Sequence, residues 1–299
     1  MIRVANAPCS WGVLEFDLGP APAPASQVLD EMAAAGYDGT ELGDWGFLPT
    51  APRALADEVR RRRLALVGAF VPVRFASPAA LDDGIARATR TARLLADAGA
   101  PGAFIVLSDD NAAVAHRTAR AGRITPDDGL SGREWDGFAE RVSAVAAAVR
   151  DAAGMRAVFH HHCAGYVETP QEIDALMART DPSLLGLCLD TGHLMYGGGD
   201  PLVAIAKYAG RIWHVHFKDC ALDTAERARR DGWDYHTAVR NGIFCELGRG
   251  MVPFAEVRDA LQLLQYSGWI VVEQDVLPGL GTPAESAGRN RAFLRQIGL

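Results

Sequence analysis

Residues 184–193 read LLGLCLDTGH, an apolar run that stops abruptly at an aspartate and a histidine. A short apolar run bounded by polar residues is typical of a strand that is buried on both faces of a parallel sheet. The same pattern occurs on either side, as RAVFHHHC at 156–163 and RIWHVHFKD at 211–219. It returns as WIVVEQD at 269–275. The repetition predicts parallel strands whose carboxyl ends carry the ionisable residues.

The rest of the chain extends this pattern to eight units. We expect strands near 2–7, 37–42, 64–71, 103–107, 156–161, 184–189, 211–217 and 269–274. Stretches with helical spacing lie between them, for example 27–35, 52–63, 81–98, 133–153 and 254–266. Strands that alternate with helices indicate a parallel sheet, and eight such units close into a barrel. The predicted fold is therefore α/β, a (β/α)₈ TIM barrel.

Two polar segments interrupt the pattern, at 113–128 and 222–248. We interpret each as an excursion inserted on a loop. The second follows the seventh predicted strand, on the face where such barrels carry their active sites. Because no linker divides the chain, we expect one barrel domain over residues 1–299.

The overall composition limits the classes of partner. A net charge of -7 argues against a nucleic-acid partner, because binding phosphates requires clustered Lys and Arg. The five cysteines are few, odd in number and widely spread, which indicates a reducing compartment rather than a disulfide framework. The sequence shows neither a secretory signal nor a long apolar run, so a cytoplasmic location without a membrane partner is expected. A small-molecule partner is expected, and homo-oligomerisation is left open.

In a barrel all the strand ends converge on one mouth. Asp190, His216 and Glu273 each end or follow a predicted strand, and so does the run His160–His162. Carboxylates and imidazoles that meet away from water destabilise one another unless a cation joins them. Ligands of these types suit one divalent ion, Mn²⁺ or Co²⁺ first, with Zn²⁺ or Mg²⁺ as alternatives.

The three successive histidines follow an apolar run, so at least one of them must point inward. In a strand His160 and His162 share one face, and His161 takes the other. Cys163 directly after them raises a structural Cys/His zinc site as a competing interpretation, although Cys-x-x-Cys spacing is absent. Each strand-end cluster alone also fits a capped turn or a hydrogen-bonded core residue. The occurrence of several such clusters at the ends of neighbouring strands favours a functional site.

With these motifs the sequence resembles the xylose isomerase-like TIM-barrel superfamily, and within it the inosose (2-keto-myo-inositol) dehydratase group. The similar stretches are APCSW at 7–11, HHH at 160–162, TPQEID at 169–174, LDTGH at 189–193, HVHFKD at 214–219 and GWIVVE at 268–273. Together they span nearly the whole chain.

The resemblance implies one metal ion held by residues from strands five to eight. It implies Asp190, His216 and Glu273 as ligands on the last three. The superfamily commonly has Glu on strand five, where this chain has the histidine run, so the fourth ligand is open between His160 and Glu168. We predict Glu168 as the fourth ligand and count His160 among the catalytic residues.

The resemblance further implies catalytic or substrate-contact roles for a set of strand-end residues. These are His160, His162, His193 and Lys218, with Trp11, Glu41 and Arg249 as further residues that line the mouth. The chemistry common to the group starts with removal of a proton next to a ketone. Dehydration, isomerisation or epimerisation then follows, and the sequence does not choose between these outcomes.

We therefore expect a metal-dependent lyase or isomerase that acts on a keto-polyol or ketose and is most similar to inosose dehydratase. A sugar (phosphate) isomerase or epimerase and a non-catalytic ligand-binding barrel are the alternatives. No Gly-rich phosphate-binding loop is evident, which favours an unphosphorylated substrate. DNA endonuclease IV shares the barrel, but it needs a multi-zinc cluster and a DNA-binding face, and the acidic charge balance does not support that face.

Overall fold

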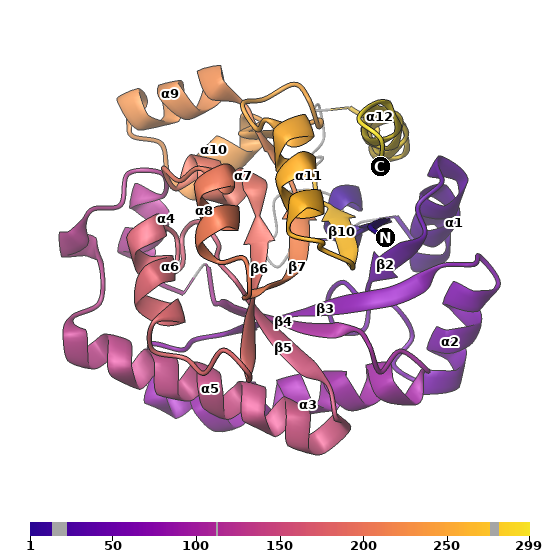
Figure 1. Ribbon diagram of the computed structural model, residues 1–299, viewed down its shortest axis with the longest axis horizontal. Coiled ribbons are helices and arrows are strands. Elements are labelled where there is room, and N and C mark those ends of the chain that lie inside the picture. Colours follow the sequence, from indigo (N-terminus) through magenta and orange to yellow (C-terminus); the bar gives the residue numbers. More distant parts are fainter. Residues whose placement is uncertain (14–22, 112, 276–280) are drawn as a thin grey trace.

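A computed structural model describes residues 1–13, 23–111, 113–275 and 281–299. All eight predicted strands are present, and they pair in parallel as a closed barrel in the order β1-β10-β7-β6-β5-β4-β3-β2 (Figure 1). The strands are β1 Arg3–Asn6, β2 Gly39–Glu41, β3 Ala65–Val73, β4 Phe104–Asp109, β5 Arg156–His160, β6 Leu185–Asp190, β7 Ile212–Phe217 and β10 Trp269–Val272. The predicted barrel fold is confirmed.

Helices connect successive strands and cover the outside of the barrel (Figure 1). They are α1 Ala25–Ala35, α2 Pro52–Arg60, α3 Leu81–Asp97, α4 Ala115–Arg120, α5 Gly132–Ala153, α6 Pro170–Met177, α7 Thr191–Tyr196, α8 Pro201–Lys207, α9 Leu222–Asp231, α10 Tyr235–Arg240, α11 Phe254–Leu263 and α12 Pro283–Gln296. The five helices expected from the sequence all form. Within the described ranges, none of the helices is both long and apolar enough to cross a membrane.

The apolar core of the barrel itself has an outer and an inner part. The larger part lies between the strands and the surrounding helices. A smaller cluster of Phe104, Val106, Val158 and Cys188 fills part of the interior of the barrel. Close packing of this kind makes the barrel a filled core rather than a pore.

Segment 113–128 is not the loop excursion that its polar sequence predicted, because it contains helix α4. Arg117 on this helix is fully buried. Its guanidinium donates two hydrogen bonds to the Glu172 carboxylate, at 2.7 and 2.8 Å, and a third to the carbonyl oxygen of Gly165 at 2.8 Å. A bidentate pair of this geometry offsets much of the cost of burying both charges. The segment is therefore anchored to α6 and to the loop after β5 through Arg117.

Segment 222–248 lies after β7, as predicted, and it is also structured. It contains α9, α10 and strand β9 Phe244–Cys245, which pairs antiparallel with β8 Asp219–Cys220. Figure 1 shows α9 and α10 (orange) beyond the ends of β6 and β7. Side chains of this segment, including Tyr235 and Phe244, form a separate apolar cluster with Tyr196. The insertion therefore covers one side of the mouth with a small core of its own.

Removing the buried cation should destabilise the fold. Arg117→Met is expected to lower the free energy of unfolding by about 3–5 kcal/mol, because Glu172 then stays buried without its counter-ion. Urea unfolding followed by circular dichroism measures this loss. The matched control is Arg120→Met on the same helix, whose side chain is 45% exposed and pairs with Asp128. It should cost only about 0–1 kcal/mol. Equal losses in the two variants would contradict the importance of the buried pair.

Candidate active site

Strand geometry gathers four polar side chains at one level of the mouth. Side chains alternate along β5, β6 and β7 between the helices and the barrel interior. The apolar residue just before each polar one packs in the outer core, so His160, Asp190 and His216 face inward. The pairing register places Asp190 beside His216. Glu273 follows the last residue of β10 and completes the group.

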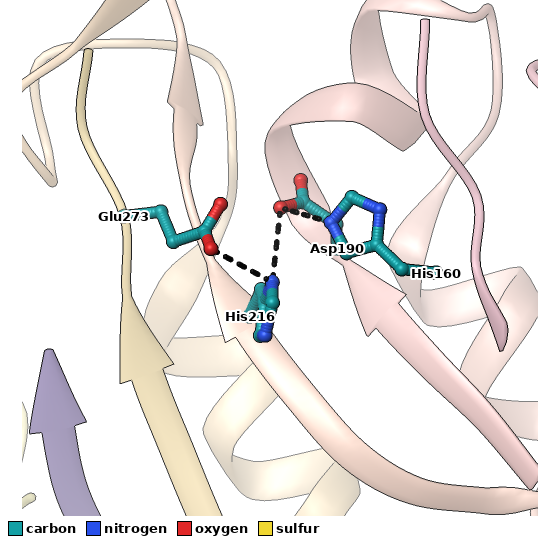
Figure 2. A group of neighbouring side chains, drawn as sticks. All are labelled: His160, Asp190, His216 and Glu273. Atoms are coloured by element: carbon teal, nitrogen blue, oxygen red, sulfur yellow. Dashed lines mark ion pairs between the residues drawn. The ribbon is translucent and has the colours of Figure 1, made fainter. Parts of the chain in front are cut away.

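The distances between these four side chains are those expected around one metal ion. His160 Nε2 lies 3.5 Å from Asp190 Oδ2. His216 Nδ1 lies 3.9 Å from the same oxygen and 3.2 Å from Glu273 Oε1 (Figure 2). Candidate ligand atoms of all four lie within 4.8 Å of one another. Two atoms that each bind one ion at about 2.1 Å are themselves about 3–4 Å apart.

Two buried atoms that face one another in this group lack a hydrogen-bond partner among the described residues. In the described part of the chain, neither Asp190 Oδ2 nor His216 Nδ1 has a hydrogen-bond partner, although both are buried. Buried polar atoms are rarely left unpaired. Burial would raise the pKa of Asp190, but the nearby His160 imidazole and the charge of Lys218 hold that pKa below its ordinary value. Two imidazole nitrogens and two carboxylates thus form a donor set that fits a divalent ion.

Lys218 supplies a positive charge beside this group. Its Nζ lies 3.3 Å from Glu273 Oε2, 3.5 Å from Asp275 Oδ1 and 3.4 Å from His193 Nε2. Burial would lower the pKa of Lys218, but the charges of Asp275 and Glu273 raise it well above its ordinary value. Burial, followed by the nearby His162, lowers the pKa of His193 well below its ordinary value. The site therefore presents an ammonium group next to a neutral imidazole.

His162 is held in a single tautomer. Its Nδ1 lies 2.6 Å from the carbonyl oxygen of Cys163, which can only accept a hydrogen bond, so Nδ1 carries the proton. Nε2 then keeps its lone pair, 3.2 Å from Asn111 Nδ2 and 3.5 Å from the Tyr235 hydroxyl. Burial, together with neighbouring cationic groups, lowers the pKa of His162 well below its ordinary value. A neutral imidazole of this kind can accept a proton.

His160 and His162 both line the cavity at the mouth, as the strand alternation predicted. His161 is buried behind them, and its Nε2 accepts a hydrogen bond from the backbone N–H of Asp190 at 3.1 Å. The middle histidine thus supports the strand end that carries Asp190, rather than facing the cavity.

Glu168 lies outside the group that the four side chains form. Its two oxygens accept hydrogen bonds from the backbone N–H groups of Gly122 and Ala164, at 2.6 and 2.8 Å. Burial raises the pKa of Glu168 to about 7, against the lowering effect of these bonds. Of the two candidates for the fourth ligand, His160 lies in the group. Glu168 instead connects the loop after α4 to the loop after β5.

The structure also bears on the proposed Cys/His zinc site at Cys163, and it shows the contacts of two expected mouth residues, Trp11 and Arg249. Neither group of metal-ligating side chains found among the described residues contains a cysteine, so Cys163 forms no Cys/His site there. Trp11 donates a hydrogen bond from its indole to Glu31 at 2.7 Å. The Arg249 side chain is 68% exposed and pairs with Glu246.

The cavity wall also contains residues that were not predicted, among them Tyr235 and Asp275. Tyr235 comes from helix α10 of the insertion, is 1% exposed and packs edge-on against the ring of His162. Its polar surroundings in the sequence give no signal for this contact. Asp275 has a signal that could have found it, since it lies two residues after Glu273 at the same strand end.

The cavity opens to solvent at the mouth of the barrel. Its wall combines ionisable side chains with apolar ones, among them Phe70, Val13 and Tyr235. Small-molecule sites combine mainly apolar walls with a few well-placed polar groups. The cavity therefore fits a small polar ligand.

Comparison with known proteins agrees with this geometry. The family model described as "Xylose isomerase-like TIM barrel" matches residues 29–297. An inosose dehydratase of Geobacillus kaustophilus (strain HTA426) is 31% identical over 295 residues, which cover 99% of this chain and 94% of the relative. An inosose dehydratase of Lacticaseibacillus casei is also 31% identical, over 98% of this chain and 96% of the relative.

Among solved structures, an L-ribulose 3-epimerase superposes with a TM-score of 0.71 at 19% identity, covering 99% of this chain and 94% of the other. At that identity the likeness shows the fold alone. The inosose dehydratase relatives confirm the expectation of an enzyme of the dehydratase or isomerase/epimerase type. The chain belongs to the xylose isomerase-like TIM barrel family.

Proposed function

We propose that this protein is a divalent-metal-dependent enzyme that removes a proton next to the carbonyl group of a keto-polyol or ketose, and that its reaction is the dehydration of an inosose-like ketone. The observation that carries the proposal is one cavity whose wall includes His160, Glu273, His162 and Lys218. The 31% identity to inosose dehydratases over nearly the full chain supports the dehydratase outcome. Isomerisation or epimerisation of a sugar is the alternative, because it begins with the same proton abstraction.

The residues that would hold the metal ion are His160, Asp190, His216 and Glu273, with His160 in the place first given to Glu168. Their mixture of imidazole and carboxylate favours Mn²⁺ or Co²⁺, with Zn²⁺ or Mg²⁺ as alternatives. When bound, such an ion supplies Lewis-acid stabilisation of the negative charge that develops on the carbonyl oxygen.

The protein side chains account for the proton transfers. His162 accepts the proton from the carbon next to the carbonyl at Nε2, the nitrogen that keeps a lone pair. The electron pair of the broken C–H bond forms a double bond to the carbonyl carbon, and the carbonyl π pair moves to the oxygen to give an enolate. For dehydration, the carbonyl re-forms, and the carbon–carbon double bond shifts to the neighbouring carbon that carries a hydroxyl. The C–O bond there breaks, and the departing hydroxyl keeps the bonding pair, takes a proton from the Lys218 ammonium and leaves as water. Both groups lie in the wall of the same cavity.

Solvent exchange tests this mechanism without requiring the outcome to be known. The protein, loaded with Mn²⁺ or Co²⁺, is incubated with 2-keto-myo-inositol and a panel of ketoses in D₂O, and NMR and mass spectrometry follow the products. We expect deuterium next to the carbonyl of at least one compound, with loss of 18 mass units for the inosose. Retained mass with altered stereochemistry would favour an epimerase or isomerase. Metal-loaded protein that shows neither exchange nor product across the panel would leave a ligand-binding barrel as the better account.

A further inference from the structure

A second carboxylate lies on the far side of the His216 ring from the proposed metal position. Glu41 Oε1 lies 3.0 Å from His216 Nε2, and the same oxygen lies 2.8 Å from His214 Nε2. Glu41 is 2% exposed and both histidines are fully buried. The other ring nitrogen of His216, Nδ1, faces Asp190 and Glu273. One imidazole therefore joins Glu41 to the four-residue group.

We propose that Glu41 is a positioning residue that accepts the Nε2 proton of His216 and so presents the Nδ1 lone pair to the metal ion. This inference rests on the proposed metal site and adds a fifth residue to it. A carboxylate that accepts the second N–H of a histidine ligand fixes its tautomer and ring orientation and makes it a stronger donor. The sequence alone gave Glu41 no such role, only a place among residues that line the mouth.

The distances favour hydrogen bonds over a second metal ion between Glu41, His214 and His216, although these three side chains also form a compact group. Separations of 2.8 and 3.0 Å from one carboxylate oxygen are ordinary N–H···O lengths. Two ligands of one ion at about 2.1 Å are about 3–4 Å apart, so the shorter separation of 2.8 Å, to His214, is the one that favours a hydrogen bond. Both imidazole N–H groups therefore point at the same oxygen.

The backbone around Glu41 is shaped to admit its side chain. The pairing of β2 with β3 changes register between Thr40 and Glu41, so that Glu41 lies beside Gly68. A Cβ atom at Gly68 would lie 2.9 Å from Glu41 Oε1, closer than side chains tolerate. The irregular register and the glycine together leave the space that the carboxylate occupies.

The test measures metal affinity rather than activity. Mn²⁺ and Co²⁺ are titrated by calorimetry into metal-free wild-type protein and into Glu41→Gln, which keeps the size of the side chain but removes its charge. We expect one ion per wild-type chain and a 10- to 100-fold weaker affinity in the variant. Gly68→Ala should weaken binding in the same direction, because it displaces the Glu41 carboxylate without changing any charge. The control is Asp38→Asn, an exposed carboxylate three residues before Glu41 that does not line the cavity, which should change the affinity less than about 3-fold.

A spectroscopic measurement on the unaltered protein keeps the test independent of how the variants fold. In Zn²⁺-loaded wild-type protein, ¹⁵N NMR of the histidine rings should show His216 protonated at Nε2 and metal-bound at Nδ1. The opposite assignment, or a Glu41→Gln affinity equal to that of the wild type, would overturn the role of Glu41 while leaving the metal site intact. Two ions per wild-type chain would place a metal at Glu41 instead. Failure of the wild type to bind any ion would overturn the proposed function together with this inference.

Discussion

Replacing His216 with alanine is expected to lower the affinity for Mn²⁺ or Co²⁺ by about 100- to 1000-fold. Four-ligand sites bind zinc with about 10–16 kcal/mol, so one ligand accounts for about 3 kcal/mol, and each 1.4 kcal/mol is a factor of ten. We expect the largest loss of metal affinity at His216, because its ring contacts Asp190 and Glu273 on one side and Glu41 on the other. Calorimetric titration of metal-free protein measures the loss.

Glu273→Ala should reduce metal affinity by a similar factor, since its Oε1 lies 3.2 Å from His216 Nδ1. The matched control is His116→Ala, which removes an exposed histidine and should leave the affinity unchanged. Full metal occupancy after both His216 and Glu273 are replaced would refute the assignment of the site.

Replacing His162 with asparagine should separate chemistry from metal binding. We expect deuterium exchange next to the carbonyl to slow by about 10²–10⁴-fold, the usual contribution of a positioned general base. The metal affinity should stay within a few-fold of the wild type, because His162 is not one of the four grouped side chains. NMR of the exchange reaction and calorimetry on the same preparation measure both quantities.

His116→Asn is the control for this variant, since it makes the same substitution at an exposed histidine. It should exchange deuterium at the wild-type rate. If His162→Asn keeps the wild-type exchange rate with the metal bound, another group removes the proton, and His193 is the next candidate because its ring centroid lies 3.8 Å from that of His162.

The barrel and much of its mouth follow from local sequence patterns. Each strand of this fold is buried on both faces, so each appears as a short apolar run, and polar residues at the end of a run mark the mouth. This logic located Asp190, His216 and Glu273 correctly at one end of the barrel, where their ligand atoms lie within 4.8 Å of one another. Alternation along a strand was enough to place His160 and His162 on the cavity side.

What the sequence did not predict depends on contacts between distant segments. The bond from His216 to Glu41 joins residues 175 positions apart, and it exists only because the barrel closes. Arg117 lies in a polar segment with no local sign of burial, and its pairing with Glu172 depends on the packing of α4 against α6. The choice between His160 and Glu168 likewise required the path of the loop after β5, where backbone N–H groups of Gly122 and Ala164 bind the Glu168 carboxylate. No local pattern encodes these pairings.

The central claim is that one divalent ion binds between the ends of β5, β6, β7 and β10. Anomalous scattering from crystals of the protein grown with Mn²⁺ tests it most directly. The account predicts one strong peak per chain, within bonding distance of His160 Nε2, Asp190 Oδ2, His216 Nδ1 and a Glu273 carboxylate oxygen. A strong peak bound by Glu168 or Glu41 instead, or no peak at the mouth from crystals that contain saturating Mn²⁺, would contradict it.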